Sequence, residues 1–297
     1  MVPKIGHQSS GRQEKIIIIL LKSGFSMMIN SAKPQQHDLP SRHDFRADMD
    51  IRPVNQYLPP YTPGGNSVTP GSMSTPWRRF LKRLHNQGIP WPGSILYNAV
   101  SLSKIFQQHY QLVAQDVARY GPADRILDIG TGPGRLLYAL RQTFPNAYLT
   151  GVDISPAMVE QALKVRTKHP DRNIDFQIAG ADNLPFDNES FDIVVSTGSI
   201  HHWKKTAQAL DEIHRILKPG GRALLYDVVR EMPREICQEL RTQYGTFRMA
   251  LLWLHSFEEP FLNADEMMAL GRESNFATHA TEFVGALCCL ILHKHES

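Results

Sequence analysis

Three glycines at alternate positions, Gly130, Gly132 and Gly134, follow a short apolar run and precede leucines at helical spacing. Glycine has no Cβ, so it adopts positive φ angles without strain and lets a ligand approach the backbone. Asp128 stands two positions before the first glycine, and Asp153 ends the next apolar run. A glycine turn between a strand and a helix, flanked by carboxylates, indicates a site for a nucleotide-like ligand.

The spacing of the glycines separates two classes of such ligands. A dinucleotide site has the pattern G-x-G-x-x-G, which needs glycine where this chain has Arg135. Asp128 would repel a pyrophosphate but can accept a hydrogen bond from an ammonium group. Asp153, which we expect at an exposed turn, can accept both hydroxyls of a ribose. These features favour S-adenosylmethionine over a dinucleotide.

Two adjacent histidines, His201 and His202, follow an apolar run that we expect to form a strand. The carboxyl ends of strands in open α/β sheets carry reactive groups, and an imidazole titrates near neutral pH, so either histidine could take a proton from an acceptor. The alternative is that one imidazole packs in the core and the other caps the next helix or meets solvent. No metal site is predicted, because adjacent histidines rarely share one ion.

The elements that position these residues alternate between strand and helix. This order predicts an α/β fold with a doubly wound, seven-stranded, mostly parallel, Rossmann-like sheet, helices on both faces and an N-terminal helical cap. The expected strands are 126–129, Tyr148–Asp153, Asn173–Ala179, Phe191–Thr197, Arg222–Val229, Thr278–Val284 and Ala286–His293, the last two forming an antiparallel pair at the sheet edge.

Helix boundaries are marked by capping residues and by helix breakers. Ser155 is expected to cap the helix that begins with Pro156, and Asn263 to cap a helix that ends near Gly271. A helix from Lys204 to Leu217 is expected, with Pro219-Gly-Gly221 preventing its continuation.

Four motifs resemble those of a known family, the class I S-adenosylmethionine-dependent methyltransferases. They are Ile126-Leu-Asp-Ile-Gly-Thr-Gly-Pro-Gly134, Gly151-Val-Asp-Ile-Ser155, Asn183-Leu-Pro-Phe186 with Ser190-Phe-Asp192, and Ile216-Leu-Lys-Pro-Gly-Gly221. The chain is most similar to a small-molecule branch that includes the quinone C-methyltransferases. The resemblance covers about Gly121 to Val229 well and both ends poorly.

The resemblance implies that S-adenosylmethionine is the methyl donor and that the loop after the third strand holds its adenine. Where the family often has Asp before Ala this chain has Gly180, and the acid falls at Asp182. The residues expected to bind the donor are Asp128, Gly130, Thr131, Gly132, Gly134, Asp153, Ile154, Ala181, Asp182 and Ser196, and the candidate catalytic residues are His201 and His202.

Composition divides the chain into three parts: a disordered tail (1–72), a helical cap (73–120) and an S-adenosylmethionine-binding methyltransferase domain (121–297). Over 77–84, apolar and basic residues fall on opposite faces of an expected helix. This amphipathic segment predicts either a peripheral membrane contact or a lid helix with a solvated face, and we favour the lid.

Charge and cysteine content limit the partners and the compartment. The net charge is +3, and all of it comes from residues 1–72, so the rest of the chain is near neutral and no nucleic-acid partner is expected. Three cysteines, two of them adjacent, make no disulfide framework. A reducing, cytoplasmic setting is therefore expected.

The acceptor is expected to be a small, hydrophobic molecule that receives the methyl group by direct in-line transfer. Apolar and aromatic residues outside the well-matched region are expected to enclose it: Trp77, Trp91, Tyr97, Tyr110 and the segment Leu251 to Phe257. Asp227 either contacts the acceptor or is a structural carboxylate. The alternatives to an enzyme of this kind are a non-catalytic S-adenosylmethionine-binding protein on the same scaffold and an NAD-dependent oxidoreductase.

Overall fold

The computed structural model describes residues 104–244 and 261–296. The predicted tail, most of the predicted cap, and the pocket candidates Trp77, Trp91, Tyr97 and Leu251 to Phe257 lie outside the described residues. Within them, Lys104–Ala118 forms helix α4, the part of the predicted cap that can be examined.

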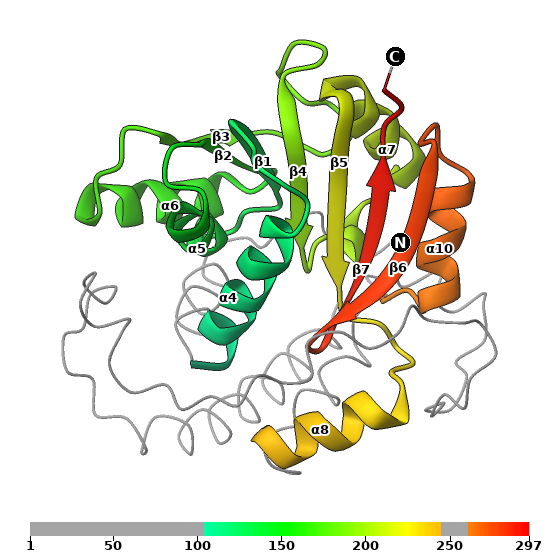
Figure 1. Cartoon of the computed structure of the whole chain (residues 1–297). Coiled ribbons are helices and arrows are strands. Elements are labelled where there is room, and N and C mark those ends of the chain that lie inside the picture. Colours follow the sequence, from blue (N-terminus) through cyan, green and yellow to red (C-terminus); the bar gives the residue numbers. More distant parts are fainter. Residues whose placement is uncertain (1–103, 245–260, 297) are drawn as a thin grey trace, which may run out of the picture. The chain divides into compact units, whose positions relative to one another are not determined.

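A seven-stranded sheet forms the centre of the described fold, in the order β3-β2-β1-β4-β5-β7-β6 (Figure 1). The first five of these strands pair in parallel, and β7 runs antiparallel to both β5 and β6. The strands are β1 (Arg125–Ile129), β2 (Tyr148–Asp153), β3 (Ile174–Ile178), β4 (Phe191–Thr197), β5 (Leu217–Asp227), β6 (Thr278–Val284) and β7 (Leu287–His293). The predicted sheet and its antiparallel edge pair are confirmed.

Helices cover both faces of the sheet and bury two apolar clusters. One cluster joins α4, α5 (Arg135–Thr143) and α6 (Pro156–Lys168) to one face. The other joins α7 (Thr206–Ile216), α8 (Arg234–Tyr244) and α10 (Ala264–Arg272) to the opposite face. Successive residues of a strand alternate between the faces, so neighbouring residues of one strand contribute to different clusters.

The adjacent cysteines of β7 illustrate this alternation. Cys288 belongs to the cluster beneath α7, and Cys289 belongs to the cluster beneath α4. Both are fully buried and both are free thiols. These two neighbours therefore point to opposite faces of the sheet.

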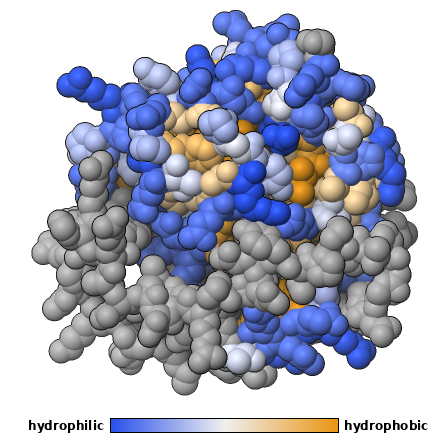
Figure 2. All heavy atoms as spheres, viewed as in Figure 1, coloured by the Kyte–Doolittle hydropathy of each residue, from blue (hydrophilic) through white to orange (hydrophobic). Residues whose placement is uncertain are grey.

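Hydrophilic residues cover most of the described surface on the face seen in Figure 2, with apolar residues visible between them. Among the described residues, the large apolar side chains that are exposed are those of Tyr148, Ile154 and Ile178. None of the helices within 104–244 and 261–296 combines the length and the hydropathy that crossing a lipid bilayer requires.

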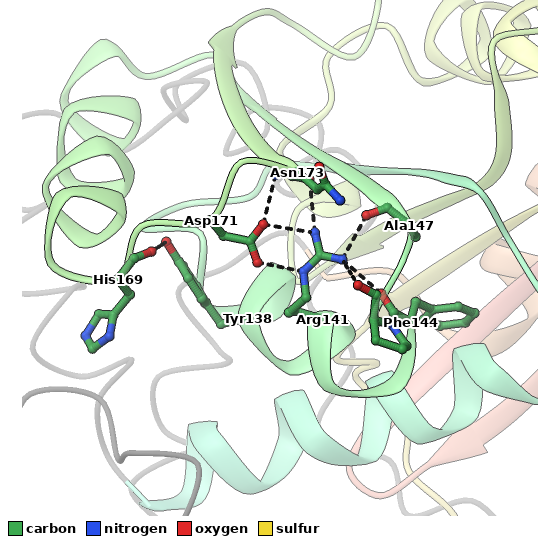
Figure 3. A network of polar contacts seen from close by, with 8 residues as sticks. Tyr138, Arg141, Phe144, Ala147, His169, Asp171 and Asn173 are labelled. Carbon is green, nitrogen blue, oxygen red and sulfur yellow. Dashed lines mark hydrogen bonds and ion pairs between the residues drawn. The ribbon is translucent and has the colours of Figure 1, made fainter.

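An arginine network ties α5 to the strands that follow it (Figure 3). The Arg141 side chain pairs with Asp171 at 2.8 Å and donates to backbone carbonyls in the loops that precede β2 and β3. These carbonyls belong to Phe144, Pro145, Ala147 and Asn173. The network therefore fixes the amino ends of two parallel strands.

Three boundary predictions meet different outcomes. Asn263 caps α10 through a capping box with Glu266, as expected. Ser155 occupies the N-cap position of α6 and Pro156 the first turn, as expected, but the Ser155 side chain makes no capping hydrogen bond. Strand β5 starts at Leu217, earlier than expected, because the chain pairs with Phe191 through an irregular register before Gly220 (φ 74°) turns it.

Candidate functional site

A pocket opens at the carboxyl ends of β1, β2 and β4, where open parallel sheets bind ligands. Four segments line it: the glycine turn after β1, the end of β2, the loop after β3 and the turn after β4. The predicted site residues that line it are Gly130, Gly132, Asp153, Ile154, Ala181, Asp182 and His202. The predicted residues that do not are Asp128, Thr131, Gly134, Ser196 and His201.

The glycine turn needs glycine for both conformation and space. Gly130, Gly132 and Gly134 have φ angles of 72°, 53° and 77°, which L side chains rarely adopt. A Cβ on Gly130 would stand 2.5 Å from the Cβ of Ser199, and a Cβ on Gly134 would stand 2.5 Å from the ring of Phe176. The first glycine thus lets the turn after β4 close against the pocket, and the third lets α5 pack on β3.

Asp153 is buried, at 8% exposure, so the prediction that it lies at an exposed turn is wrong. The backbone folds around its carboxylate, which accepts N–H groups from Gly132 at 2.9 Å and Ser155 at 2.8 Å. Burial raises the pKa of Asp153, and the two backbone bonds lower it in part. Each oxygen keeps a further lone pair, so the carboxylate can still accept two hydroxyl groups from the pocket.

Asp128 lies beneath the glycine turn and is 1% exposed. Burial raises the pKa of Asp128 to about 7, the Thr131 hydroxyl lowers it, and the charge of Asp153 raises it again. Neither Asp128 nor Thr131 lines the pocket. Their contact with a donor stays a prediction. In the structure both side chains are buried next to the glycine turn.

Another part of the pocket lining consists of apolar residues and one acidic residue. Ile154, Met158, Ala179 and Ala181 line it, together with Asp182. A Cβ on Gly180 would stand 2.8 Å from Oδ1 of Asp182, the far end of a flexible side chain, so the Asp182 carboxylate folds back close to the backbone of Gly180.

The turn after β4 is organised by Ser199. Its hydroxyl lies 2.7 Å from the hydroxyl of Ser196 and accepts the indole N–H of Trp203 at 3.1 Å. Ser196 is fully buried beneath the turn, so its predicted contact with the donor also stays a prediction. Thr197 lines the pocket, and its buried hydroxyl has no hydrogen-bond partner among the described residues. Such a group is satisfied when a polar molecule binds.

The two histidines occupy different environments. His201 is 5% exposed, and its ring lies between those of His202 and Phe261, with centroid distances of 4.0 and 4.4 Å. Nδ1 of His201 lies 2.8 Å from Asp227, and the backbone N–H of His201 donates to the same carboxylate at 3.1 Å. His202 lines the pocket. Asp227 is therefore a buried carboxylate that holds His201, and its contact with an acceptor stays a prediction.

Some pocket residues were missed by sequence reasoning. They are Ile129, Met158, Ala179, Thr197, Gly198, Ser199, Trp203, Lys204, Lys205 and Ala209. Ile129 and Ala179 were detectable in principle, because each ends or follows an apolar run at the edge where ligands bind. No three His, Cys, Asp or Glu side chains in 104–244 and 261–296 are grouped so that they could hold a metal ion.

Comparison with known proteins identifies the family of the part of the chain that contains this pocket. A family model described as a methyltransferase domain matches residues 121–269, half of the chain. The chain is 30% identical over 117 residues to an arsenite methyltransferase from Halobacterium salinarum, covering 39% of this chain and 30% of that protein. It is 39% identical over 103 residues to a demethylmenaquinone methyltransferase from Chlorobaculum tepidum, covering 35% of this chain and 40% of that one.

A solved structure from Methanococcus maripaludis, assigned to the S-adenosyl-L-methionine-dependent methyltransferases, matches with a TM-score of 0.57 at 23% identity. The match covers 72% of this chain and 97% of that one, which supports the fold. The chain spans only 30% and 40% of the lengths of the two curated relatives. The predicted resemblance is confirmed: the chain belongs to the methyltransferase domain family and has the doubly wound sheet of its class I members.

Proposed function

We propose that this chain is an S-adenosylmethionine-dependent methyltransferase that acts on a small, hydrophobic acceptor. The observation that carries the proposal is the pocket at the carboxyl edge of the sheet. There the positive-φ glycine turn faces a buried carboxylate, Asp153, and an apolar wall with one acid, Asp182. The proposed methyltransferase domain spans 121–297, with 73–120 as its cap.

The residues present fit such a donor. Asp153 can accept a ribose diol through its free lone pairs. Ile154, Met158 and Ala181 can enclose a flat base, and the Asp182 carboxylate can accept an exocyclic amine at the rim. The bare backbone of Gly130 and Gly132 leaves room for the amino-acid end. The buried Thr197 hydroxyl offers a further polar contact.

When bound, the donor supplies an electrophilic methyl carbon, so the protein needs no covalent intermediate. The work of the chain is to align the acceptor with that carbon and to exclude water, which is worth on the order of 7 to 11 kcal/mol at best. An acceptor that loses a proton on methylation also needs a base. His202 lines the pocket and His201 lies against it, so the imidazole pair is where that proton can be held.

The acceptor side stays a prediction. Trp77, Trp91, Tyr97 and Leu251 to Phe257 lie outside the described residues, and Tyr110 on α4 does not line the pocket. The relatives act on acceptors as different as arsenite and demethylmenaquinone, by their names, so their substrates are not transferred to this chain. The two buried free cysteines support a reducing, cytoplasmic setting, and a near-neutral domain argues against a nucleic-acid partner.

Two measurements test the proposal. Calorimetry should show binding of S-adenosylhomocysteine and S-adenosylmethionine, and no comparable binding of NAD. A screen of phenolic, enolic and thiol acceptors with labelled donor should then yield a methylated product. Preferential binding of NAD would overturn the proposal in favour of an oxidoreductase. Donor binding without turnover on any acceptor, including cell extracts, would favour a non-catalytic binding protein.

A further inference from the structure

The loop between β3 and β4 forms a wall of the pocket, although it belongs to neither strand. Ala181 and Asp182 face the pocket from this loop. Its own backbone forms an isolated bridge between Gly180 and Asn183. The loop is also anchored in the apolar core by Leu184, whose side chain is 3% exposed. A wall of this kind keeps its shape only if a neighbouring element holds it.

Helix α7 presents three polar side chains to this loop at helical spacing, Gln208, Glu212 and Arg215. The Gln208 amide donates to the carbonyl of Asp182 at 2.9 Å. The Glu212 carboxylate accepts the backbone N–H of Leu184 at 2.9 Å. Helix α7 therefore binds the loop backbone at the residue that lines the pocket and again two residues later.

Arg215 makes the largest set of these contacts. Its guanidinium donates to the carbonyls of Leu184 at 3.0 Å and Phe186 at 2.7 Å, and to the amide oxygen of Asn188 at 3.0 Å. It also pairs with Glu212 through two bonds of 2.8 Å. The planar fork of arginine suits several carbonyls at once, which a lysine cannot reproduce.

The pair is held in its charged form. The hydrogen bonds from Arg215 are the main reason that the pKa of the Glu212 carboxyl is lowered, and the same bonds raise the pKa of Arg215. A charged pair that binds both an N–H and two carbonyls of one loop fixes that loop in position and in orientation.

We propose that Glu212 and Arg215 are positioning residues that hold the loop at 180–186 against the pocket, and that they thereby set donor affinity and selectivity for the donor's base. This inference rests on the proposed function. It assigns the adenine end of the donor to a wall whose position depends on α7. Loss of the Glu212 and Arg215 contacts would therefore displace the Asp182 carboxylate from the adenine while leaving Asp182 itself unchanged.

Arg141 provides a matched control within the same chain. It too pairs with a carboxylate, Asp171, and donates to loop carbonyls, as Figure 3 shows. Its loops precede β2 and β3, at the amino ends of the strands, whereas the pocket lies at the carboxyl ends. Removing either arginine should cost stability for the same chemical reason, but only Arg215 should affect the donor.

The experiment compares Arg215→Met and Arg141→Met in the full chain. Calorimetry measures affinity for S-adenosylhomocysteine and for its inosine analogue, in which a carbonyl replaces the exocyclic amine, and melting is recorded alongside. Arg215→Met should bind S-adenosylhomocysteine about tenfold or more weakly, equivalent to about 1.4 kcal/mol. It should also lose the preference for S-adenosylhomocysteine over the inosine analogue. Arg141→Met should keep affinity within about twofold and keep that preference, at a comparable loss in melting temperature.

Two milder variants keep the test decisive if Arg215→Met folds poorly. Arg215→Lys and Glu212→Gln should each lie between the wild type and Arg215→Met in base preference. Unchanged affinity and preference in well-folded Arg215 and Glu212 variants would overturn the inference and leave the proposed function standing. Failure of the wild-type chain to bind S-adenosylhomocysteine would instead overturn the proposed function and the inference with it.

Discussion

Nδ1 of His201 lies 2.8 Å from Oδ2 and 3.0 Å from Oδ1 of Asp227. The two residues are 26 positions apart and meet because β4 and β5 are adjacent in the sheet. The carboxylate also accepts the backbone N–H of Val228 at 2.8 Å. Since an ionised carboxylate only accepts, the geometry assigns a proton to Nδ1 of His201 and leaves Nε2 as its basic nitrogen.

Replacing Asp227 with Asn should lower turnover strongly, because the amide removes the charge that fixes the His201 tautomer. A loss of about a hundredfold in kcat is expected, with donor affinity within a few fold of wild type. The measurement is kcat against pH together with calorimetric Kd for S-adenosylhomocysteine. His202→Gln is the companion variant, since His202 lines the pocket. Full activity in Asp227→Asn would remove the pair from the reaction.

Replacing Asp153 with Ala should weaken donor binding about a hundredfold or more, because it removes two charged hydrogen bonds worth about 1.5 to 3 kcal/mol each. It should also lower stability, because the carboxylate accepts the N–H groups of Gly132 and Ser155. Calorimetry and thermal melting separate the two effects. Donor affinity equal to wild type would place the ribose elsewhere.

Replacing Asp128 with Asn should change the pH dependence of stability. Burial raises the pKa of Asp128 to about 7 in the folded state, above its ordinary value of 3.8. The carboxyl therefore stays protonated in the fold while the unfolded chain ionises, so it costs stability progressively as pH rises from about 4 to about 7. In urea unfolding, the free energy of unfolding of Asp128→Asn should increase relative to that of the wild type as the pH rises across that window. A difference that is constant with pH would contradict the raised pKa.

The hydroxyl of Tyr226 should contribute measurably to stability, because it donates to Asp116 on α4 at 2.7 Å and both residues are buried. Tyr226→Phe leaves a buried carboxylate with one bond fewer, which should cost about 1 to 3 kcal/mol in urea unfolding. Tyr138→Phe is a suitable control, since its hydroxyl makes a weaker bond of 3.4 Å to the carbonyl of His169. Equal losses in the two variants would argue against a special role for the buried bond.

The sequence predicted those features that depend on local pattern. Both ends of β4 (Phe191–Thr197) were predicted, because its apolar residues Phe191 and 193–195 lie between segments of turn residues. Asn263 was found as a cap because capping is decided within one turn of helix. The glycine turn was likewise found from spacing alone.

The features that the sequence did not reveal depend on which strands become neighbours. Asp227 could be recognised as the partner of His201 only once β4 and β5 were paired. Ser155 caps α6 by position, as predicted, but its backbone N–H donates to the Asp153 carboxylate, a contact that propensity does not include. The contacts of Arg215 with the loop likewise join residues about 30 positions apart.

The position of β7 in the sheet has a consequence for how the chain is made. Strand β7 is the last strand to leave the ribosome among those described, yet it lies between β5 and β6 and adds residues to both apolar clusters. Until it emerges, β5 has an unpaired edge and β6 has no strand to join. Until β7 pairs with it, the growing chain therefore exposes the edge of β5, and an unpaired strand edge is prone to aggregation.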